Sequence, residues 1–139
     1  MRWNLALSTS GTAAVEFALV FPLFVLVFFG LAAYGVYFGA SHSIQQIAAD
    51  AARTAVAGLD LSERQHLVSD FVDRHAAGYV FVDPARMSVE TRDATAGEPR
   101  LTVTVRYDVR DLPIWGILGD VPLPDLVIVH SSTVRMGGY

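Results

Sequence analysis

The sequence predicts an α+β fold in which one long N-terminal helix carries a small domain made of a second helix and an antiparallel sheet. An apolar run that continues into an alanine-rich amphipathic segment predicts the long helix. A shorter helical pattern between two glycines predicts the second helix, and late segments with alternating polarity predict the strands. We expect the sheet to pack on the long helix, because each element has one apolar face to bury.

The chain consists of two pieces that differ in charge. It has 139 residues, of which 53% are hydrophobic, and its net charge is −4. Arg2 and Glu16 are the only charged side chains before residue 50, although the chain has 10 basic and 14 acidic residues. The basic residues form no cluster, so nucleic acid is not expected as a partner. The absence of Cys excludes a disulfide framework and a thiolate metal site.

The apolar run is long enough to cross a bilayer. Residues 17–40 carry no charge, and as a helix they would span about 36 Å, against a hydrocarbon core of about 30 Å. A cleaved secretory signal is the alternative, but its apolar region usually has only about 7–15 residues. We therefore expect a single-pass anchor in contact with membrane lipid. Because Arg2 precedes the span, the N-terminus is expected in the cytoplasm and the C-terminal domain outside.

Pro22 and three glycines, Gly30, Gly35 and Gly39, lie inside this span. Pro22 removes a backbone hydrogen bond and crowds the carbonyl of Ala18, so we expect a helix break there, as a bend or a loosened turn. Gly35 and Gly39 have two interpretations. They are either ordinary membrane-helix composition or a small-xxx-small surface for close helix packing.

The helix is expected to continue beyond the membrane as an amphipathic stem. Its apolar face is predicted to contain Ile44, Ile47, Ala48, Ala51, Ala52 and Ala55. Gly58 is a natural C-cap, so one helix is predicted from about Ala13 to Ala57. We therefore divide the chain into a leader (1–11), a transmembrane helix with its stem (12–57) and an extracytoplasmic α+β domain (58–139).

The outer domain is predicted to begin with a second helix. Ser62 and Gln65 fit a capping box, and the apolar face of this helix would contain Leu67, Val68, Phe71, Val72 and His75. Three strands are then predicted, from the segments 87–92, 100–110 and 126–136. The segment 112–125, with three prolines and two glycines, is expected to be an irregular connection.

The sequence contains no recognisable catalytic or metal-binding motif. The four histidines are scattered, and His66 and His75 are nine residues apart, on opposite faces of a helix. There is no H-E-x-x-H or G-x-S-x-G motif and no phosphate loop after a strand. We therefore expect neither an enzyme nor a bound metal or cofactor.

The most specific motif lies at the N-terminal end of the apolar run. In "SGTAAVEF", Gly11 precedes Glu16 by five residues and Phe17 opens the run. Together with Pro22 and the alanine-rich "QQIAADAARTAVAG", this segment resembles the TadE-like pseudopilins and minor pilins of the tight-adherence (Flp-type) type IV pilus machinery. The resemblance implies a pilin-like fold, a bacterial inner-membrane location, and other pilus subunits and pilus-assembly membrane proteins as partners.

The resemblance also implies processing by a prepilin peptidase. This enzyme would cut after Gly11, so that Gly11, Thr12, Glu16 and Phe17 form the processing site, residues 1–11 are a cleaved leader and Thr12 becomes the N-terminus. In an assembly, the Glu16 carboxylate of one subunit can pair with the Thr12 amine of a neighbour. Alone in the bilayer, the carboxylate could instead be protonated. Two other classes remain open: a single-pass anchored binding or sensor domain, and an envelope enzyme.

Overall fold

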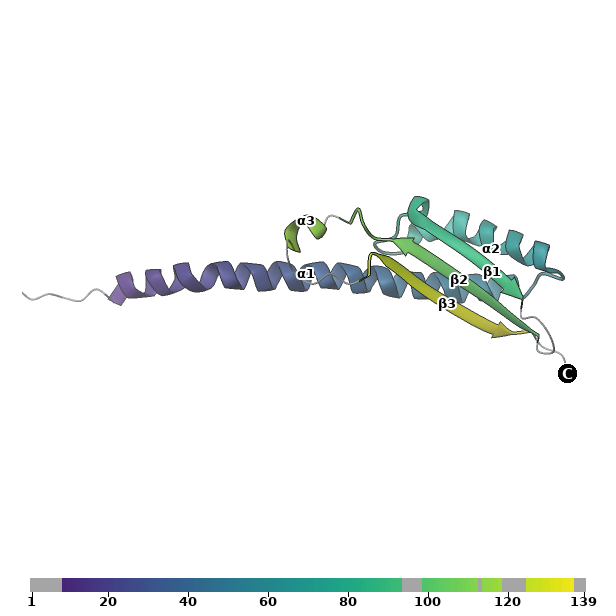
Figure 1. Ribbon diagram of the computed structural model, residues 1–139, viewed down its shortest axis with the longest axis horizontal. Helices are drawn as coiled ribbons and strands as arrows, with labels where there is room; N and C mark the ends of the chain where they lie inside the picture. Colours follow the sequence, from purple (N-terminus) through teal and green to yellow (C-terminus); the bar gives the residue numbers. More distant parts are fainter. Residues whose placement is uncertain (1–8, 94–98, 113, 119–124, 137–139) are drawn as a thin grey trace, which may run out of the picture.

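A long helix, α1 (Thr9–Ala55), forms the axis of the molecule, and the other elements pack along its C-terminal half (Figure 1). The structure, a computed structural model, describes residues 9–93, 99–112, 114–118 and 125–136. The predicted α+β class is confirmed, because the long apolar helix, a second helix and an antiparallel sheet are all present. Residues 1–8 of the predicted leader lie outside the described residues.

The helix α1 is continuous through Pro22. The helix break predicted there does not appear as an interruption of the helix. Proline removes one bond of the helical ladder, but its fixed φ suits a helix, so the hydrogen bonds of the flanking turns keep the segment helical. Beyond the stem, the backbone N–H of Gly58 donates to the carbonyl of Ala55 at 3.1 Å.

The second helix, α2 (Leu61–His75), begins with a different cap from the one predicted. Asp60, not Ser62, is the N-cap, and its Oδ1 accepts a hydrogen bond from the Glu63 N–H at 2.8 Å. Glu63 Oε2 in turn accepts from the Leu59 N–H at 2.7 Å. The arrangement resembles a capping box, except that the Glu63 carboxylate binds the N–H of Leu59, one residue before the N-cap. Both candidate pairs have the required spacing, but the chain already enters the helix at Leu61, which leaves Ser62 inside its first turn.

The sheet has three antiparallel strands in the order β1-β2-β3. They are β1 (Met87–Asp93), β2 (Arg100–Asp108) and β3 (Val127–Arg135), close to the predicted segments. Two short 3-10 turns, η1 (Ala76–Gly78) and η2 (Pro84–Arg86), lead into β1. The irregular connection before β3 contains one short helix, α3 (Trp115–Leu118), which the sequence did not predict.

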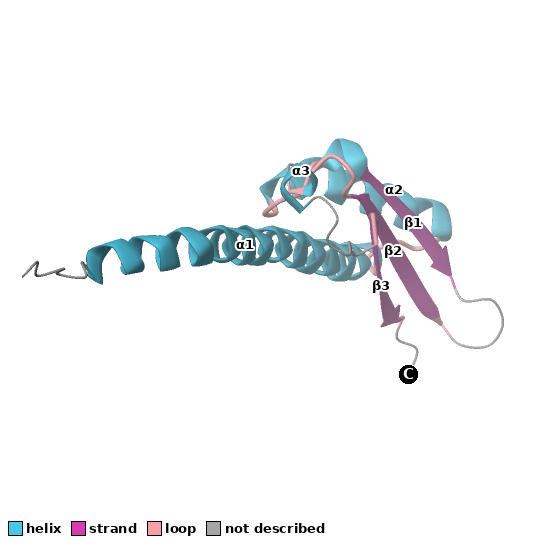
Figure 2. Cartoon of the chain, turned by 60° about the vertical axis from the view of Figure 1, so that its left-hand side comes forward, coloured by secondary structure: helices cyan, strands magenta, loops and turns pink. Residues whose placement is uncertain are grey.

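The core lies between the sheet and the two helices. Alternate residues of β2 are buried, namely Leu101, Val103, Val105 and Tyr107, and the intervening threonines face outward. The predicted face of the stem is confirmed, because its six residues are 0–1% exposed. The stem contacts β2 and β3, and α2 contacts β1. Figure 2 shows the sheet and α2 beside the same C-terminal stretch of α1.

Candidate functional site

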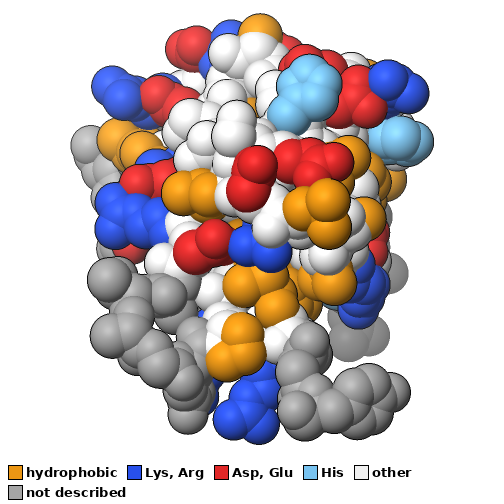
Figure 3. Space-filling model, turned by 90° about the vertical axis from the view of Figure 1, so that its right-hand side faces the viewer, with side chains coloured by type: hydrophobic (Ala, Val, Ile, Leu, Met, Phe, Trp, Pro, Cys, Tyr) orange, Lys and Arg blue, Asp and Glu red, His pale blue; other side chains and the backbone are white. Residues whose placement is uncertain are grey.

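The N-terminal half of α1 is exposed along its whole length. Every side chain from residue 11 to residue 24 is exposed, including large ones such as Phe17, at 65%. Among the described residues, α1 is the one helix long and apolar enough to cross a bilayer, and none of its most apolar window is buried. The helix therefore fits a single-pass membrane anchor. Figure 3 shows the opposite end of the molecule, where charged side chains are interspersed with apolar ones.

The predicted processing residues all lie in the first turns of α1. Gly11, Thr12, Glu16 and Phe17 are helical and exposed. Thr12 and Glu16 are four residues apart, so they lie on one face of the helix, one turn from each other. Glu16 makes no hydrogen bond or ion pair with the described residues. Within the described part of the chain, this exposed carboxylate has no partner.

The described residues of the C-terminal domain lie too far from Glu16 to be its partner. The first buried residue of α1 is Ala33, which packs against Ile114. It is 17 residues beyond Glu16, or about 26 Å along the helix axis. No side chain bridges that distance. The structure therefore brings the processing residues together on one helix end but leaves them far from the domain.

Gly35 and Gly39, the two glycines of the possible small-xxx-small surface, have different surroundings. A Cβ at Gly35 would meet no atom within 4 Å, whereas a Cβ at Gly39 would lie 2.9 Å from the Phe81 ring. Phe81 has φ 60°, which is uncommon for a bulky residue. Gly39 therefore serves packing within this chain, and only Gly35 remains open for a small-xxx-small contact with another helix.

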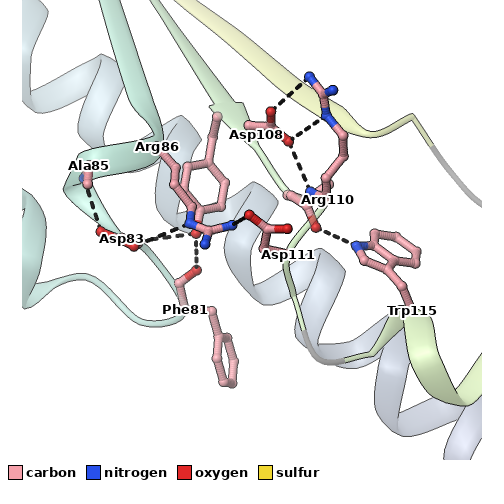
Figure 4. Close-up of polar contacts among 10 residues, drawn as sticks. Phe81, Asp83, Ala85, Arg86, Asp108, Arg110, Asp111 and Trp115 are labelled. Atoms are coloured by element: carbon pink, nitrogen blue, oxygen red, sulfur yellow. Dashed lines mark hydrogen bonds and ion pairs between the residues drawn. The ribbon is translucent and has the colours of Figure 1, made fainter.

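A polar cluster fixes the loops at the end of the sheet nearer the N-terminal half of α1 (Figure 4). Arg86 forms ion pairs with Asp83 and Asp111. The Tyr107 hydroxyl accepts a hydrogen bond from the Asp83 N–H at 3.1 Å and donates one to the Phe81 carbonyl at 3.3 Å. These contacts join the loop before β1 to the end of β2. They explain how Phe81 is held over α1 in its unusual conformation.

A second part of this cluster orders the segment after β2. Asp108 accepts hydrogen bonds from the backbone and the side chain of Arg110, which hold the pKa of its carboxyl below the ordinary value. The Trp115 indole N–H donates to the Val109 carbonyl. Both interactions lie where β2 leads into α3, so their role is to position that segment.

Tyr79, His130 and His75 have structural partners. Burial raises the pKa of the Tyr79 phenol, and so does its 2.9 Å hydrogen bond to Asp50. The imidazole Nε2 of His130 lies 2.9 Å from the Ser41 hydroxyl, and His75 stacks on Phe71. No group of three His, Asp or Glu residues within the described ranges could hold a metal ion.

Sequence reasoning missed Phe81 and Trp115. Trp115 lies in the segment expected to be irregular, Phe81 lies in a short apolar run that was assigned to no element, and both pack on α1. A large aromatic side chain in a segment rich in Gly or Pro is a usable signal, since such a side chain usually needs a surface to cover.

The comparisons with known proteins support the resemblance that the N-terminal motif predicted. A family model described as TadE-like protein matches residues 11–53. Searches among curated proteins and solved structures found no match. The matched range begins at Gly11 and ends in the last turn of α1, so it covers the anchor and the stem but not the sheet. Over these residues the chain is similar to TadE-like proteins, as the sequence predicted.

Proposed function

We propose that the protein is a minor pilin or pseudopilin that takes part in assembling a tight-adherence (Flp-type) type IV pilus. The observation that carries the proposal is the TadE-like match, which begins at Gly11 on a helix whose first half is exposed and apolar. The protein would act at the bacterial inner membrane as a single-pass subunit with its domain outside. Its partners would be a prepilin peptidase, other pilus subunits and pilus-assembly membrane proteins.

Processing explains why a carboxylate stands at the start of the apolar run. Cleavage after Gly11 would create an ammonium group on Thr12, and an unpaired charge in hydrocarbon is costly. Thr12 and Glu16 lie one turn apart on one face of α1. A neighbouring subunit displaced by about 6 Å along the helix axis would bring its Thr12 amine level with this Glu16 carboxylate. The pairing therefore favours the assembly over the isolated subunit.

The first test determines the N-terminal residue of the protein in the membrane fraction by mass spectrometry. A mature chain that begins at Thr12 is expected, and a Gly11→Leu variant should keep its full length. Gly30→Leu is the matched control, because Gly30 also lies open on α1, and it should mature normally. If the wild type kept residues 1–11, the peptidase step would be excluded and an anchored binding or sensor domain would become the better interpretation.

The second test separates Glu16 as an assembly residue from Glu16 as a peptidase signal. Glu16→Gln should mature normally and insert well, because an amide costs less than a carboxylate in the bilayer. Its co-purification with other pilus subunits should fall. Removing one partner of a buried pair can cost about 3–5 kcal/mol, and about 1.4 kcal/mol changes an equilibrium tenfold. Leu19→Gln is the control, since it adds the same amide to the exposed span but keeps the carboxylate.

The third test concerns orientation. The chain has no Cys, so single cysteines can be placed at Ser8 and at Thr133, which is exposed on β3. Both are made in the Gly11→Leu background, which should keep residues 1–11. A membrane-impermeant thiol reagent added to spheroplasts should then label Thr133→Cys and not Ser8→Cys. The reverse pattern would place the domain in the cytoplasm and would exclude the proposed role.

A further inference from the structure

The short helix α3 packs on α1 at the point where the exposed half of α1 ends. Ile114 is 6% exposed and packs against Ala33, which is 2% exposed. The Trp115 ring lies 6.4 Å from the Tyr37 ring, centroid to centroid. In Figure 1, α3 lies nearer to the N-terminal half of α1 than the sheet and α2 do. This segment is therefore the part of the domain closest to the anchor.

The level of α3 relative to a bilayer follows from the rise of the helix. If the hydrocarbon core begins after Glu16, about 20 residues at 1.5 Å each fill its thickness of about 30 Å, which brings its outer boundary close to Val36. Ala33 and Tyr37 lie on either side of that boundary. Ile114 and Trp115 are therefore level with the outer edge of the hydrocarbon core and the headgroups above it.

The residue types at this level suit a lipid interface. Tyr34, Tyr37 and Trp115 provide the amphipathic rings that gather at membrane surfaces. The indole of Trp115 is half-buried and its N–H already has a partner in the Val109 carbonyl, so contact with lipid leaves no donor unpaired.

A second loop exposes apolar side chains slightly farther from the bilayer centre. Val80 is 63% exposed and Phe81 is 48% exposed, and Phe38 of α1 is 64% exposed. Phe81 covers Gly39, which is about 4–5 Å beyond the estimated boundary at Val36. The headgroup layer on each side of the core is about 5–8 Å thick. These side chains are therefore at the depth of the headgroups.

We propose that Ile114 and Trp115 and the loop residues Val80 and Phe81 rest in the headgroup layer of the outer leaflet, as a second contact with phospholipid besides the anchor helix. The inference rests on the proposed membrane anchor. A single helix can slide and tilt in a bilayer, whereas aromatic side chains at the interface fix depth and rotation. The contact would hold the domain at a defined height and turn one face of α1 toward neighbouring subunits.

The test uses fluorescence quenching in the full-length chain. The protein has two Trp residues, so Trp3→Phe leaves Trp115 as the single reporter. The variant is reconstituted into vesicles of phosphatidylethanolamine and phosphatidylglycerol, with a nitroxide carried either near the headgroup or near the end of the acyl chain. The headgroup nitroxide should remove the larger part of the Trp115 emission, and the chain-end nitroxide should remove less.

Two further variants, both made in a Trp3→Phe/Trp115→Phe background, calibrate the depth. Val27→Trp places the reporter near the middle of the span, where the chain-end nitroxide should quench it best. Leu59→Trp places the reporter at the far end of the stem, where the native side chain is 88% exposed and neither nitroxide should act. Circular dichroism checks that each variant is folded.

The outcomes separate the inference from the proposed function. If Trp115 is no more quenched than the Leu59→Trp reporter while the Val27→Trp reporter is quenched, the lipid contact is overturned and the anchor stands. If the Val27→Trp reporter is not quenched either, the membrane anchor itself is wrong, and the proposed function with it.

Discussion

The N-terminal and C-terminal halves of α1 are both apolar, but they differ in the size of their side chains and in what covers them. Phe17, Leu23 and Phe24 are about two-thirds exposed, at 63–65%, whereas Ala48, Ala51 and Ala55 of the stem are 0–1% exposed. Alanine side chains let the sheet approach the helix backbone closely. Bulky side chains instead offer a large contact area to a fluid environment. From residue 48 onward the buried residues of α1 are all Ala, whereas most apolar side chains of the exposed half are bulky.

The largest expected effect comes from replacing a small, buried side chain of the stem with a large one. Ala51→Leu adds volume where no space is available, so we expect the free energy of unfolding of the outer domain to fall by about 1–3 kcal/mol. Ala32→Leu makes the same change at an exposed position of the N-terminal half and should stay within about 0.5 kcal/mol. Urea unfolding in detergent, followed by near-UV circular dichroism, measures both. Equal losses would show that the two halves are packed alike.

The next effect tests how the end of the stem is fixed to the domain. Arg64 Nη1 pairs with Asp93 Oδ2 at 2.8 Å, and Arg64 Nε donates to the Gly58 carbonyl at 3.0 Å. The two side chains are only 14% and 31% exposed. Because the pair is partly solvated, we expect Arg64→Met to cost about 1.5 kcal/mol, the lower end for hydrogen bonds to charged groups.

Arg53 provides the matched control for this substitution. It pairs with Asp50 at 2.8 Å, but its side chain is 73% exposed. Arg53→Met should therefore change the free energy of unfolding by less than about 0.5 kcal/mol in the same urea assay. A larger loss at Arg53 than at Arg64 would mean that surface charge, and not the junction, stabilises the end of the stem.

The sequence predicted the features that depend on periodicity. The buried face of the stem and the alternation of β2 follow from spacing, and both were correct. The sequence did not predict features that depend on contacts between distant residues. Phe81 covers Gly39, although the two residues are 42 positions apart in the sequence. No local pattern predicts this contact. The role of Glu16 stays a prediction, because its proposed partner belongs to another molecule.

The choice between Asp60 and Ser62 as the N-cap of α2 was also beyond the sequence, and it gives the third prediction. Asp60→Ala removes the acceptor for the Glu63 N–H, so we expect a loss of about 1 kcal/mol in the free energy of unfolding. Ser62→Ala changes the residue that the sequence favoured and should cost less than about 0.5 kcal/mol. Thermal unfolding of the two variants compares them. A greater loss of unfolding free energy for Ser62→Ala than for Asp60→Ala would show that Ser62 is the cap, as the sequence predicted.

The smallest expected effect lies at the boundary between the two halves, where the open Gly35 and the covered Gly39 are one turn apart. Replacing Gly by Ala inside a helix usually stabilises it by roughly 0.5–1 kcal/mol. At Gly35 the methyl group meets no atom within 4 Å, so Gly35→Ala should give most of this gain. At Gly39 the methyl group would lie 2.9 Å from the Phe81 ring, and displacing the ring should cancel the gain.

A double-mutant cycle shows whether Phe81 causes the difference between the two glycines. In a Phe81→Ala background the ring is absent, so Gly39→Ala should stabilise the protein as much as Gly35→Ala does. The coupling energy between positions 39 and 81 should then be about 0.5–1 kcal/mol, within the range for residues in contact. Positions 35 and 81 should show no coupling. Equal gains at both glycines in the native background would mean that Phe81 does not cover Gly39, and the packed half of α1 would then begin beyond that residue.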